Sequence, residues 1–240
     1  MKAIVLAAGF ATRLYPLTLE RAKPLLEVGG RPVLSRSLDR LASIEDLSDV
    51  IVVTNAKFHA QFDEWRVTED RPWPVRLLND GSLQNEARLG AVRDLALALR
   101  ITGSADVLVL AGDNLVDFDL APYARAFQAL QRPLILVRSM LEVPPLRHGE
   151  VQIDNAGRVI VFREKPADPR SRVVATCLYF FPAAVRGWIA EYLVEGGETD
   201  APGFFLEWLV TRHEVNAMPI QGRLHDIGDP ASLEAARREF

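Results

Sequence analysis

The stretch Leu6–Leu34, LAAGFATRLYPLTLERAKPLLEVGGRPVL, decides how we interpret the rest of the chain. It begins at the end of the apolar segment Lys2–Ala7, which is typical of a strand buried on both faces of a parallel sheet. A loop of small residues follows, Ala8–Thr12, whose successive backbone N–H groups can converge on one anion. Arg13 then supplies a planar fork that matches phosphate oxygens, and Lys23 supplies a mobile point charge. The stretch therefore predicts a phosphate-binding loop after the first strand.

Two familiar phosphate-binding motifs are absent from this region. The chain has no G-x-x-x-x-G-K-[ST] P-loop, and no G-x-G-x-x-G follows the first strand. The loop therefore differs from the phosphate-binding loops of P-loop enzymes and dinucleotide-binding proteins.

Apolar strands alternate with amphipathic helices through the first part of the chain, which indicates βαβ units and a parallel sheet. The expected strands are Lys2–Ala7, Asp49–Thr54, Pro74–Leu78, Ala105–Ala111 and Pro133–Val137. The expected helices are Pro32–Ile44, Phe58–Val67, Arg88–Leu99 and Ala121–Leu130. After them we expect a hairpin over Glu150–Phe162, strands at Val173–Phe181 and Val215–Ile220, and helices at Pro182–Leu193, Asp200–Val210 and Pro230–Arg238. The fold class is α/β, Rossmann-like, with a mostly parallel sheet flanked by helices, in a single domain over residues 1–240.

The composition excludes several classes of protein. Apolar residues make up 49% and charged residues 25% of the chain, as in ordinary globular proteins. The net charge of −4 leaves no electrostatic footprint for nucleic acid or an anionic membrane. The single cysteine, Cys177, excludes an intrachain disulfide and a cysteine-based zinc cluster. Neither a signal peptide nor an apolar run of membrane-spanning length is present, so we expect a cytoplasmic protein.

The opening stretch closely resembles the sugar-phosphate nucleotidylyltransferases, of the glucose-1-phosphate thymidylyltransferase type. Their pattern reads roughly L-A-A-G-x-G-T-R-L-x-P-L-T, then P-K-P-L, then G-x-P. The matching segments are Leu6–Gly9, Thr12–Leu14, Pro16–Thr18, Lys23–Leu25 and Gly30–Pro32. Ala11 stands where the family has a second Gly, and Ala22 where it has Pro. Because Ala keeps the loop small, we expect phosphate access to survive.

The resemblance implies a nucleotide-binding half over about residues 1–140 and a sugar-phosphate-binding half over about residues 141–240. It implies that Arg13, Lys23 and Asp113 are catalytic. The nucleotide-binding set that we carry over comprises Leu6, Ala8, Gly9, Ala11, Thr12, Arg13, Lys23, Asn79, Gly81 and Gly90. Gly90 lies near a helix start, where the lack of a side chain would let a base approach the backbone. Taken alone, Asp80 and Ser82 are equally well interpreted as residues of a solvated Asx turn.

Carboxylates follow the strand ends, where ligands of open parallel sheets bind. Asp113, in Gly112–Asn114, matches the metal-binding Asp of the family, although an isolated strand-end Asp is more often a turn or cap residue. Asp226 matches the second carboxylate of the family, with Leu224 at the usual Trp position. The resemblance thus implies a Mg²⁺ cofactor held by Asp113 and Asp226, since Mg²⁺ takes one or two carboxylates plus substrate phosphates.

The second half carries the residues that the resemblance assigns to the sugar phosphate. Lys165 would grip the phosphate and Glu164 would contact sugar hydroxyls, although the bare triplet E-K-P also suits a charged surface turn. In the segment T-C-L-Y, Cys177 stands where Gly is usual, and its side chain would narrow the sugar pocket. Its alternative role is that of a small buried hydrophobe.

These residues predict transfer of a nucleotidyl group from a nucleoside triphosphate to a sugar 1-phosphate, with release of pyrophosphate. Two alternatives stay open. One is a GT-A-type glycosyltransferase that uses a D-x-D motif, for which Asp117–Asp119 is the candidate, although a helix cap is the better interpretation of that triplet. The other is a non-catalytic sensor of nucleotide sugars. We expect a pyrimidine base and no nucleic-acid or membrane partner; the sugar and any homo-oligomer are left open.

Overall fold

The computed structural model describes residues 1–240, which form two compact units. Unit 1 comprises Met1–Arg88, Leu110–Ala121 and Gly222–Phe240. Unit 2 comprises Leu89–Val109 and Pro122–Gln221. Each unit is therefore assembled from segments that are far apart in the sequence. The expectation of a single domain stays a prediction.

The sheet of unit 1 is built on parallel strands. β1 (Lys2–Leu6) pairs with β4 (Asp49–Thr54), and β4 pairs with β5 (Val75–Asn79), both in parallel. The end of β6 (Val107–Ala111) belongs to this unit and neighbours β1. Every residue of β4 is buried, as the apolar run Val50–Val53 within it predicts. The strand ends that carry the candidate residues therefore share one edge.

Two helices cover this sheet, and a small substructure lies beside it. α1 (Val33–Leu41) buries the apolar side chains that recur at helical spacing, and α2 (His59–Thr68) buries Phe62 and Trp65. Two pairs of short antiparallel strands complete the unit: β2 (Glu27–Val28) with β3 (Arg31–Pro32), and β7 (Asn114–Val116) with β13 (Leu224–Asp226).

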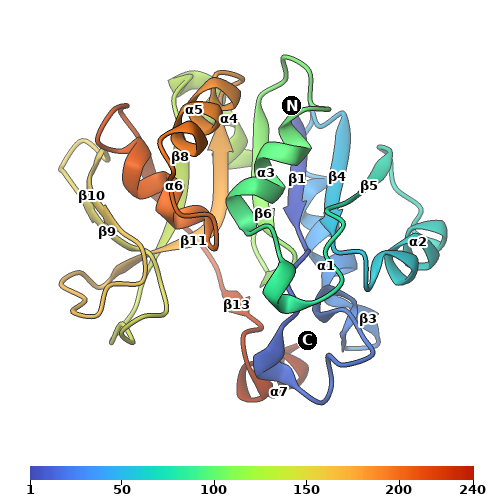
Figure 1. Cartoon of the computed structure of the whole chain (residues 1–240). Coiled ribbons are helices and arrows are strands. Elements are labelled where there is room, and N and C mark those ends of the chain that lie inside the picture. The colour runs from blue at the N-terminus through green and yellow to red at the C-terminus, as the bar shows by residue number, and fades with distance from the viewer. The chain divides into compact units, whose positions relative to one another are not determined.

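The last helix of the chain lies against the first loop. α7 (Pro230–Glu239) begins with a capping box in which the Asp229 carboxylate accepts from the Ser232 N–H and the Ser232 hydroxyl accepts from the Asp229 N–H. Figure 1 shows α7, in red, beside the blue N-terminal segment. One hydrophobic cluster joins them; it contains Leu14, Leu26, Val28, Val33, Leu115, Ile227, Leu233 and Ala236, with Ala11 and Phe240 at its edge. Residues from both ends of the sequence thus share one core.

Unit 2 is mixed. β11 (Val173–Phe181) is antiparallel to β8 (Leu134–Ser139) and to β9 (Glu150–Ile153). β9 forms a hairpin with β10 (Val159–Arg163), and β12 (Asn216–Pro219) runs parallel to β8. A bulge interrupts β11 between Ala175 and Tyr179.

Four helices accompany these strands: α3 (Ala91–Leu99), α4 (Ala121–Leu130), α5 (Val185–Val194) and α6 (Pro202–Leu209). Aromatic rings form much of the packing among them. Phe127 of α4 stacks on Phe180 at 5.7 Å between ring centroids, and Phe181 meets Phe205 of α6 at 6.0 Å. The expected α/β fold, with a mostly parallel sheet flanked by helices, is confirmed.

Several element boundaries differ from the expectation. The helix expected from Arg88 begins at Ala91, because Gly90 adopts a φ of +91° that no helix residue can have. The helix expected from Asp200 begins at Pro202, with Ala201 at the cap position. The pairing of β7 with β13 was not expected. None of the helices combines the length and the apolar character that crossing a membrane requires.

Candidate active site

Hydrogen bonds hold the backbone of the first loop of unit 1 in place. The Ala7 N–H donates to the Val53 carbonyl at 2.9 Å, and the Asn55 amide donates to the Ala8 carbonyl at 2.9 Å. The Thr18 hydroxyl donates to the Ala11 carbonyl at 2.8 Å. These bonds leave Gly9 exposed, and a methyl group placed on it would meet no atom within 4 Å. Neither crowding nor a positive φ requires glycine there, so the open space above Gly9 is the feature that a ligand would use.

Ala11 turns the chain toward Arg13. Its φ of +50° and ψ of +45° are left-handed, a conformation that glycine adopts more readily. Its side chain packs at the edge of the cluster that contains α7. A single 3-10 turn follows at Thr12–Leu14, in which Leu14 is buried and Arg13 is exposed. Ala11 therefore holds a left-handed conformation that glycine adopts at no steric cost.

Lys23 and Asp113 form an ion pair between Nζ and Oδ2. Their side chains are 16% and 20% exposed. Gly112 brings the two segments together: its N–H donates to the Leu6 carbonyl at 2.9 Å, and a methyl group on it would lie 3.2 Å from Cγ of Pro24. Residues predicted to be catalytic from two distant segments are therefore in direct contact.

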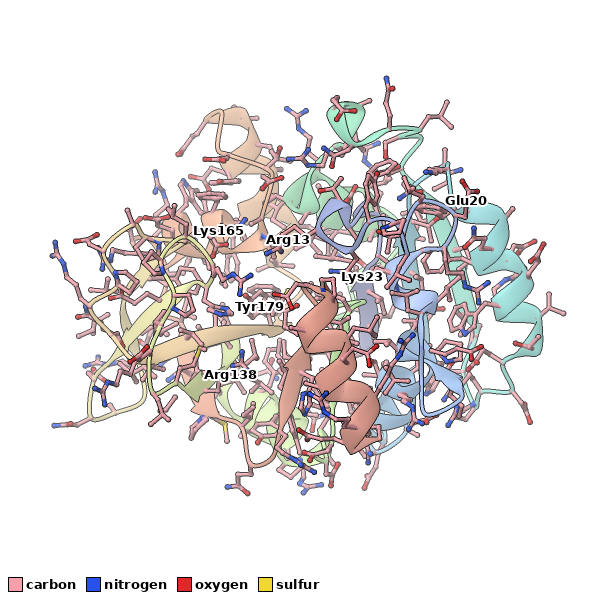
Figure 2. The ribbon with its side chains drawn as sticks, turned by 90° about the horizontal axis from the view of Figure 1, so that it is seen from below. Arg13, Glu20, Lys23, Arg138, Lys165 and Tyr179 are labelled. Atoms are coloured by element: carbon pink, nitrogen blue, oxygen red, sulfur yellow. The ribbon has the colours of Figure 1, made fainter.

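Asp226 and Arg13 lie near the ion pair of Lys23 and Asp113. The pairing of β13 with β7 aligns Asp226 with Asn114, and the Ile227 N–H donates to the Asp113 carbonyl at 3.2 Å. A methyl group placed on Gly228 would lie 3.7 Å from Oδ1 of Asp226 and 3.8 Å from Nη2 of Arg13. Figure 2 labels Arg13 and Lys23. Two cations and two carboxylates thus gather beside the loop that contains Gly9.

The donor set at this edge suits Mg²⁺ bound together with phosphate. No group of three or more His, Cys, Asp or Glu side chains is arranged to hold a metal ion by itself. Asp113, directly before β7, and Asp226, in the neighbouring β13, match the one or two carboxylates that Mg²⁺ takes beside substrate phosphates.

The turn after β5 is held by its own side chains. Oδ1 of Asn79 accepts from the Gly81 N–H at 2.8 Å, and Oδ1 of Asp80 accepts from the Ser82 N–H at 2.7 Å. These are the Asx turns of the alternative interpretation.

Gly90 belongs to unit 2, where Thr199 occupies the space that a side chain would need: its carbonyl oxygen would lie 2.4 Å from an added methyl group. Packing therefore accounts for this glycine, and a role of Asn79, Gly81 and Gly90 toward the base stays a prediction.

In unit 2, Glu164 lies in a cradle of two glycines. A methyl group on Gly203 would lie 1.8 Å from its Oε2, and one on Gly149 would lie 2.9 Å from the same atom. Burial raises the pKa of the Glu164 carboxyl to about 7; Lys165 opposes this shift, and the carboxylates of Glu207, Asp200 and Glu198 add to it. The cradle is a feature that the sequence did not indicate, because the two glycines are distant from residue 164.

Lys165 lies between two carboxylates. Its Nζ is 3.5 Å from Oδ2 of Asp200 and 4.0 Å from Oε1 of Glu164. Its backbone has a φ of +47°, and its N–H donates to the His148 carbonyl at 3.2 Å. The sequence predicted Asp200 only as the first residue of a helix, so its contact with Lys165 was not expected. Only the fold of unit 2 reveals that contact.

Cys177 lies in the bulge of β11 with a φ of +55°, the second position at which the chain replaces a family glycine and keeps a left-handed backbone. The Tyr179 hydroxyl is hydrogen-bonded to Cys177. Burial, with the nearby Cys177 and Glu164, raises the pKa of Tyr179 well above its ordinary value, so its phenol stays protonated. Tyr179, Lys165 and Arg138, which are labelled in Figure 2, all belong to unit 2. Cys177 therefore belongs to the same part of unit 2 as Glu164.

Arg138 also affects the pKa of His148. Burial and the guanidinium groups of Arg138 and Arg147 lower the pKa of His148, which keeps its imidazole neutral at pH 7.

A profile of the family described as "Nucleotidyl transferase" matches residues 2–240. The chain belongs to this family. The chain is 26% identical over 247 residues to a glucose-1-phosphate thymidylyltransferase of Streptomyces antibioticus, covering 99% of the chain and 65% of the relative. It is 27% identical over 231 residues to the mannose-1-phosphate guanylyltransferase catalytic subunit beta of Drosophila pseudoobscura pseudoobscura, covering 95% and 59%. The chain thus spans less than two thirds of each relative's length.

Among solved structures, the chain is similar to a UDP-glucose pyrophosphorylase complexed with UDP-glucose. The TM-score is 0.85 at 15% identity, and the match covers 99% of the chain and 97% of the other protein. At that identity the likeness shows a shared fold.

Proposed function

We propose that the chain transfers a nucleotidyl group from a nucleoside triphosphate to a sugar 1-phosphate, giving a nucleotide sugar and pyrophosphate. The observation that carries the proposal is the group formed by Lys23, Asp113, Asp226 and Arg13 beside the open loop at Gly9. The family match and the relatives named above support the same reaction class.

The reaction needs alignment and charge neutralisation more than it needs a protein nucleophile. A phosphate oxygen of the sugar 1-phosphate attacks the α-phosphorus, and a new P–O bond forms. The bond from the α-phosphorus to the bridging oxygen breaks, and pyrophosphate leaves with that electron pair. Because the attacking phosphate is already anionic, no strong base is required, and the rate depends on position and on electrostatic stabilisation.

In this mechanism the residues of unit 1 hold the triphosphate. The backbone around Gly9 and the exposed guanidinium of Arg13 bind the β- and γ-phosphates, which favours departure of pyrophosphate. The ammonium of Lys23 neutralises charge at the α-phosphate. Asp113 and Asp226 would hold Mg²⁺ at the same edge. The chemistry that Mg²⁺ supplies when bound is neutralisation of phosphate charge.

The residues of unit 2 would receive the acceptor. Lys165 would bind the phosphate of the sugar 1-phosphate through its half-exposed ammonium. Glu164, in its cradle of Gly149 and Gly203, would accept hydrogen bonds from sugar hydroxyls when it is ionised. The side chain of Cys177 would limit the size of the sugar.

An assay of pyrophosphate release tests the proposal. A panel of nucleoside triphosphates is combined with several sugar 1-phosphates and Mg²⁺, and we expect a pyrimidine triphosphate to give the highest output. Arg13→Ala and Lys23→Ala should each lower turnover by about 10²–10³-fold, because each removes an electrostatic stabiliser. Arg21→Ala is the matched control, since Arg21 is a cation of the same loop whose Nε donates to the Leu25 carbonyl. Near-normal turnover in Arg13→Ala or Lys23→Ala would contradict the mechanism.

The glycosyltransferase alternative is weakened by the contacts of its motif. Asp117 accepts from the Arg223 N–H and from its Nε at 2.9 Å, and Oδ1 of Asp119 accepts from the Ala121 N–H at 2.9 Å, at the start of α4. Both carboxylates therefore serve as structural acceptors.

A further inference from the structure

The ion pair of Lys23 and Asp113 is held in a rigid frame. Lys23 opens a short 3-10 turn whose next two residues, Pro24 and Leu25, are buried. The Ala22 N–H before it donates to Oε1 of Gln61 at 3.1 Å. On the other side, the Ile227 N–H donates to the Asp113 carbonyl. The backbones on both sides are thus fixed, and the pair is mostly shielded from water, with side chains 16% and 20% exposed.

This pair conflicts with a divalent cation at Asp113. The Oδ2 atom of Asp113 already contacts the Lys23 ammonium. Mg²⁺ binds a carboxylate oxygen at 2.0–2.1 Å, and two cations at one oxygen repel strongly where water is largely excluded. The ammonium therefore has to move before a divalent cation can use that oxygen.

We propose that Lys23 is a placeholder, which occupies Asp113 in the nucleotide-free protein and keeps divalent cations away until a triphosphate offers the ammonium another partner. The inference rests on the proposed function for the identity of that partner. Lys23 suits the task because its four-carbon stem lets the ammonium swing while the backbone stays fixed. Asp226 alone offers one exposed carboxylate, and one carboxylate holds a hydrated Mg²⁺ weakly. The cation consequently binds with the triphosphate and not before it.

Binding of Mn²⁺ to the full chain without nucleotide tests the inference. Mn²⁺ replaces Mg²⁺ as the probe because free Mn²⁺ is measured directly by electron paramagnetic resonance. The wild type, Lys23→Gln and Arg21→Gln are compared. Both variants change the net charge by the same amount, but only Lys23→Gln removes the partner of Asp113. We expect Lys23→Gln to bind Mn²⁺ about tenfold more tightly than the wild type, and Arg21→Gln to bind like the wild type.

Adding Asp113→Asn to Lys23→Gln should return the affinity to the wild-type value, which would identify Asp113 as the carboxylate released. Lys23→Met serves as a second variant, because methionine cannot donate a hydrogen bond to Asp113, and melting curves confirm that each variant is folded. Equal affinity of the wild type and both Lys23 variants would overturn the inference. An equal gain in Arg21→Gln would also overturn it, because net charge would then be the cause. Absence of pyrophosphate release by the wild type would refute the proposed function and would leave the Mn²⁺ comparison intact.

Discussion

Replacing Gly90 by alanine tests whether the structure around the start of α3 is understood. Gly90 has a φ of +91° and a ψ of +150°, a region that residues with a side chain almost never adopt. A methyl group there would lie 2.4 Å from the carbonyl oxygen and 2.6 Å from the carbonyl carbon of Thr199. Both are backbone atoms, so a rotamer change cannot relieve the clash.

The magnitude follows from two costs. The backbone strain contributes about 1–3 kcal/mol. The forced shift of Thr199 weakens its bond from the Val92 N–H, at 3.0 Å, and its own hydroxyl bond to Leu89, at 3.1 Å. Each such bond contributes about 1 kcal/mol. The lower entropy of alanine in the unfolded chain offsets about 0.4–1 kcal/mol. Gly90→Ala should therefore lower the free energy of unfolding of unit 2 by about 2–5 kcal/mol.

Urea denaturation followed by tryptophan fluorescence measures this loss, since Trp188 and Trp208 both lie in unit 2. Two matched glycines of the same unit are the controls. Gly103 has a φ of +64° with open space around it, so Gly103→Ala should cost only about 1 kcal/mol. Gly187 lies within α5 with open space and no positive φ, so Gly187→Ala should stabilise by about 1 kcal/mol. If Gly90→Ala and Gly103→Ala cost the same, the clash with Thr199 is not real.

Three further predictions concern single side chains. Glu164→Gln should stabilise the protein at pH 8 by up to about 3 kcal/mol, since the wild-type carboxyl has its pKa raised to about 7 and each pKa unit corresponds to about 1.4 kcal/mol. As the pH rises past about 4.5, residue 164 ionises in the unfolded chain before it does in the folded protein, so the wild type loses stability between pH 4.5 and pH 7. Below pH 4.5 the carboxyl is protonated in both states, and the stability advantage of Glu164→Gln should vanish. A gain in stability that is constant with pH would contradict the raised pKa of Glu164. Ala11→Gly should change stability by less than about 0.5 kcal/mol, because relief of the left-handed backbone strain cancels the lost packing. Ala11→Val should cost about 2 kcal/mol or more, because a β-branched side chain fits a left-handed backbone poorly. Equal melting temperatures of the two variants would refute this prediction. Asp200→Asn should raise KM for the sugar 1-phosphate about two- to fivefold, as expected for a partly exposed ion pair, and leave KM for the triphosphate unchanged; equal changes in both constants would show a structural role.

Much of the fold could be predicted because local signals agreed with tertiary context. β4 was expected over the residues that it occupies, because the apolar run Val50–Val53 at its centre has no exposed face to interrupt it. β11 was likewise expected over its full length. Helix starts were less accurate. At Gly90 and at Asp200 the chain continues in an extended or left-handed form because segments 89–92 and 199–200 hold each other by hydrogen bonds, which no local pattern reveals.

In the candidate site, too, some contacts could be predicted from the sequence and others depend on tertiary packing. The strand-end rule placed Asp113 beside the first loop, and the ion pair with Lys23 agrees with that placement. The contacts that define the surroundings of Glu164 and Lys165 come instead from Gly149, Gly203 and Asp200, which reach them through the folding of unit 2. Glycine and a surface aspartate carry little information by themselves, so sequence alone could not single them out.

The pairing of β7 with β13 also determines when during synthesis the candidate site can form. Arg223, at the start of this pairing, binds Asp117 across 106 residues of sequence. A chain still attached to the ribosome, with residues beyond 220 not yet made, already contains the first loop, Lys23 and Asp113 but lacks the strand that aligns Asp226 with Asn114. Until the segment beyond residue 220 has been made, the nascent chain therefore cannot bring Asp113 and Asp226 together.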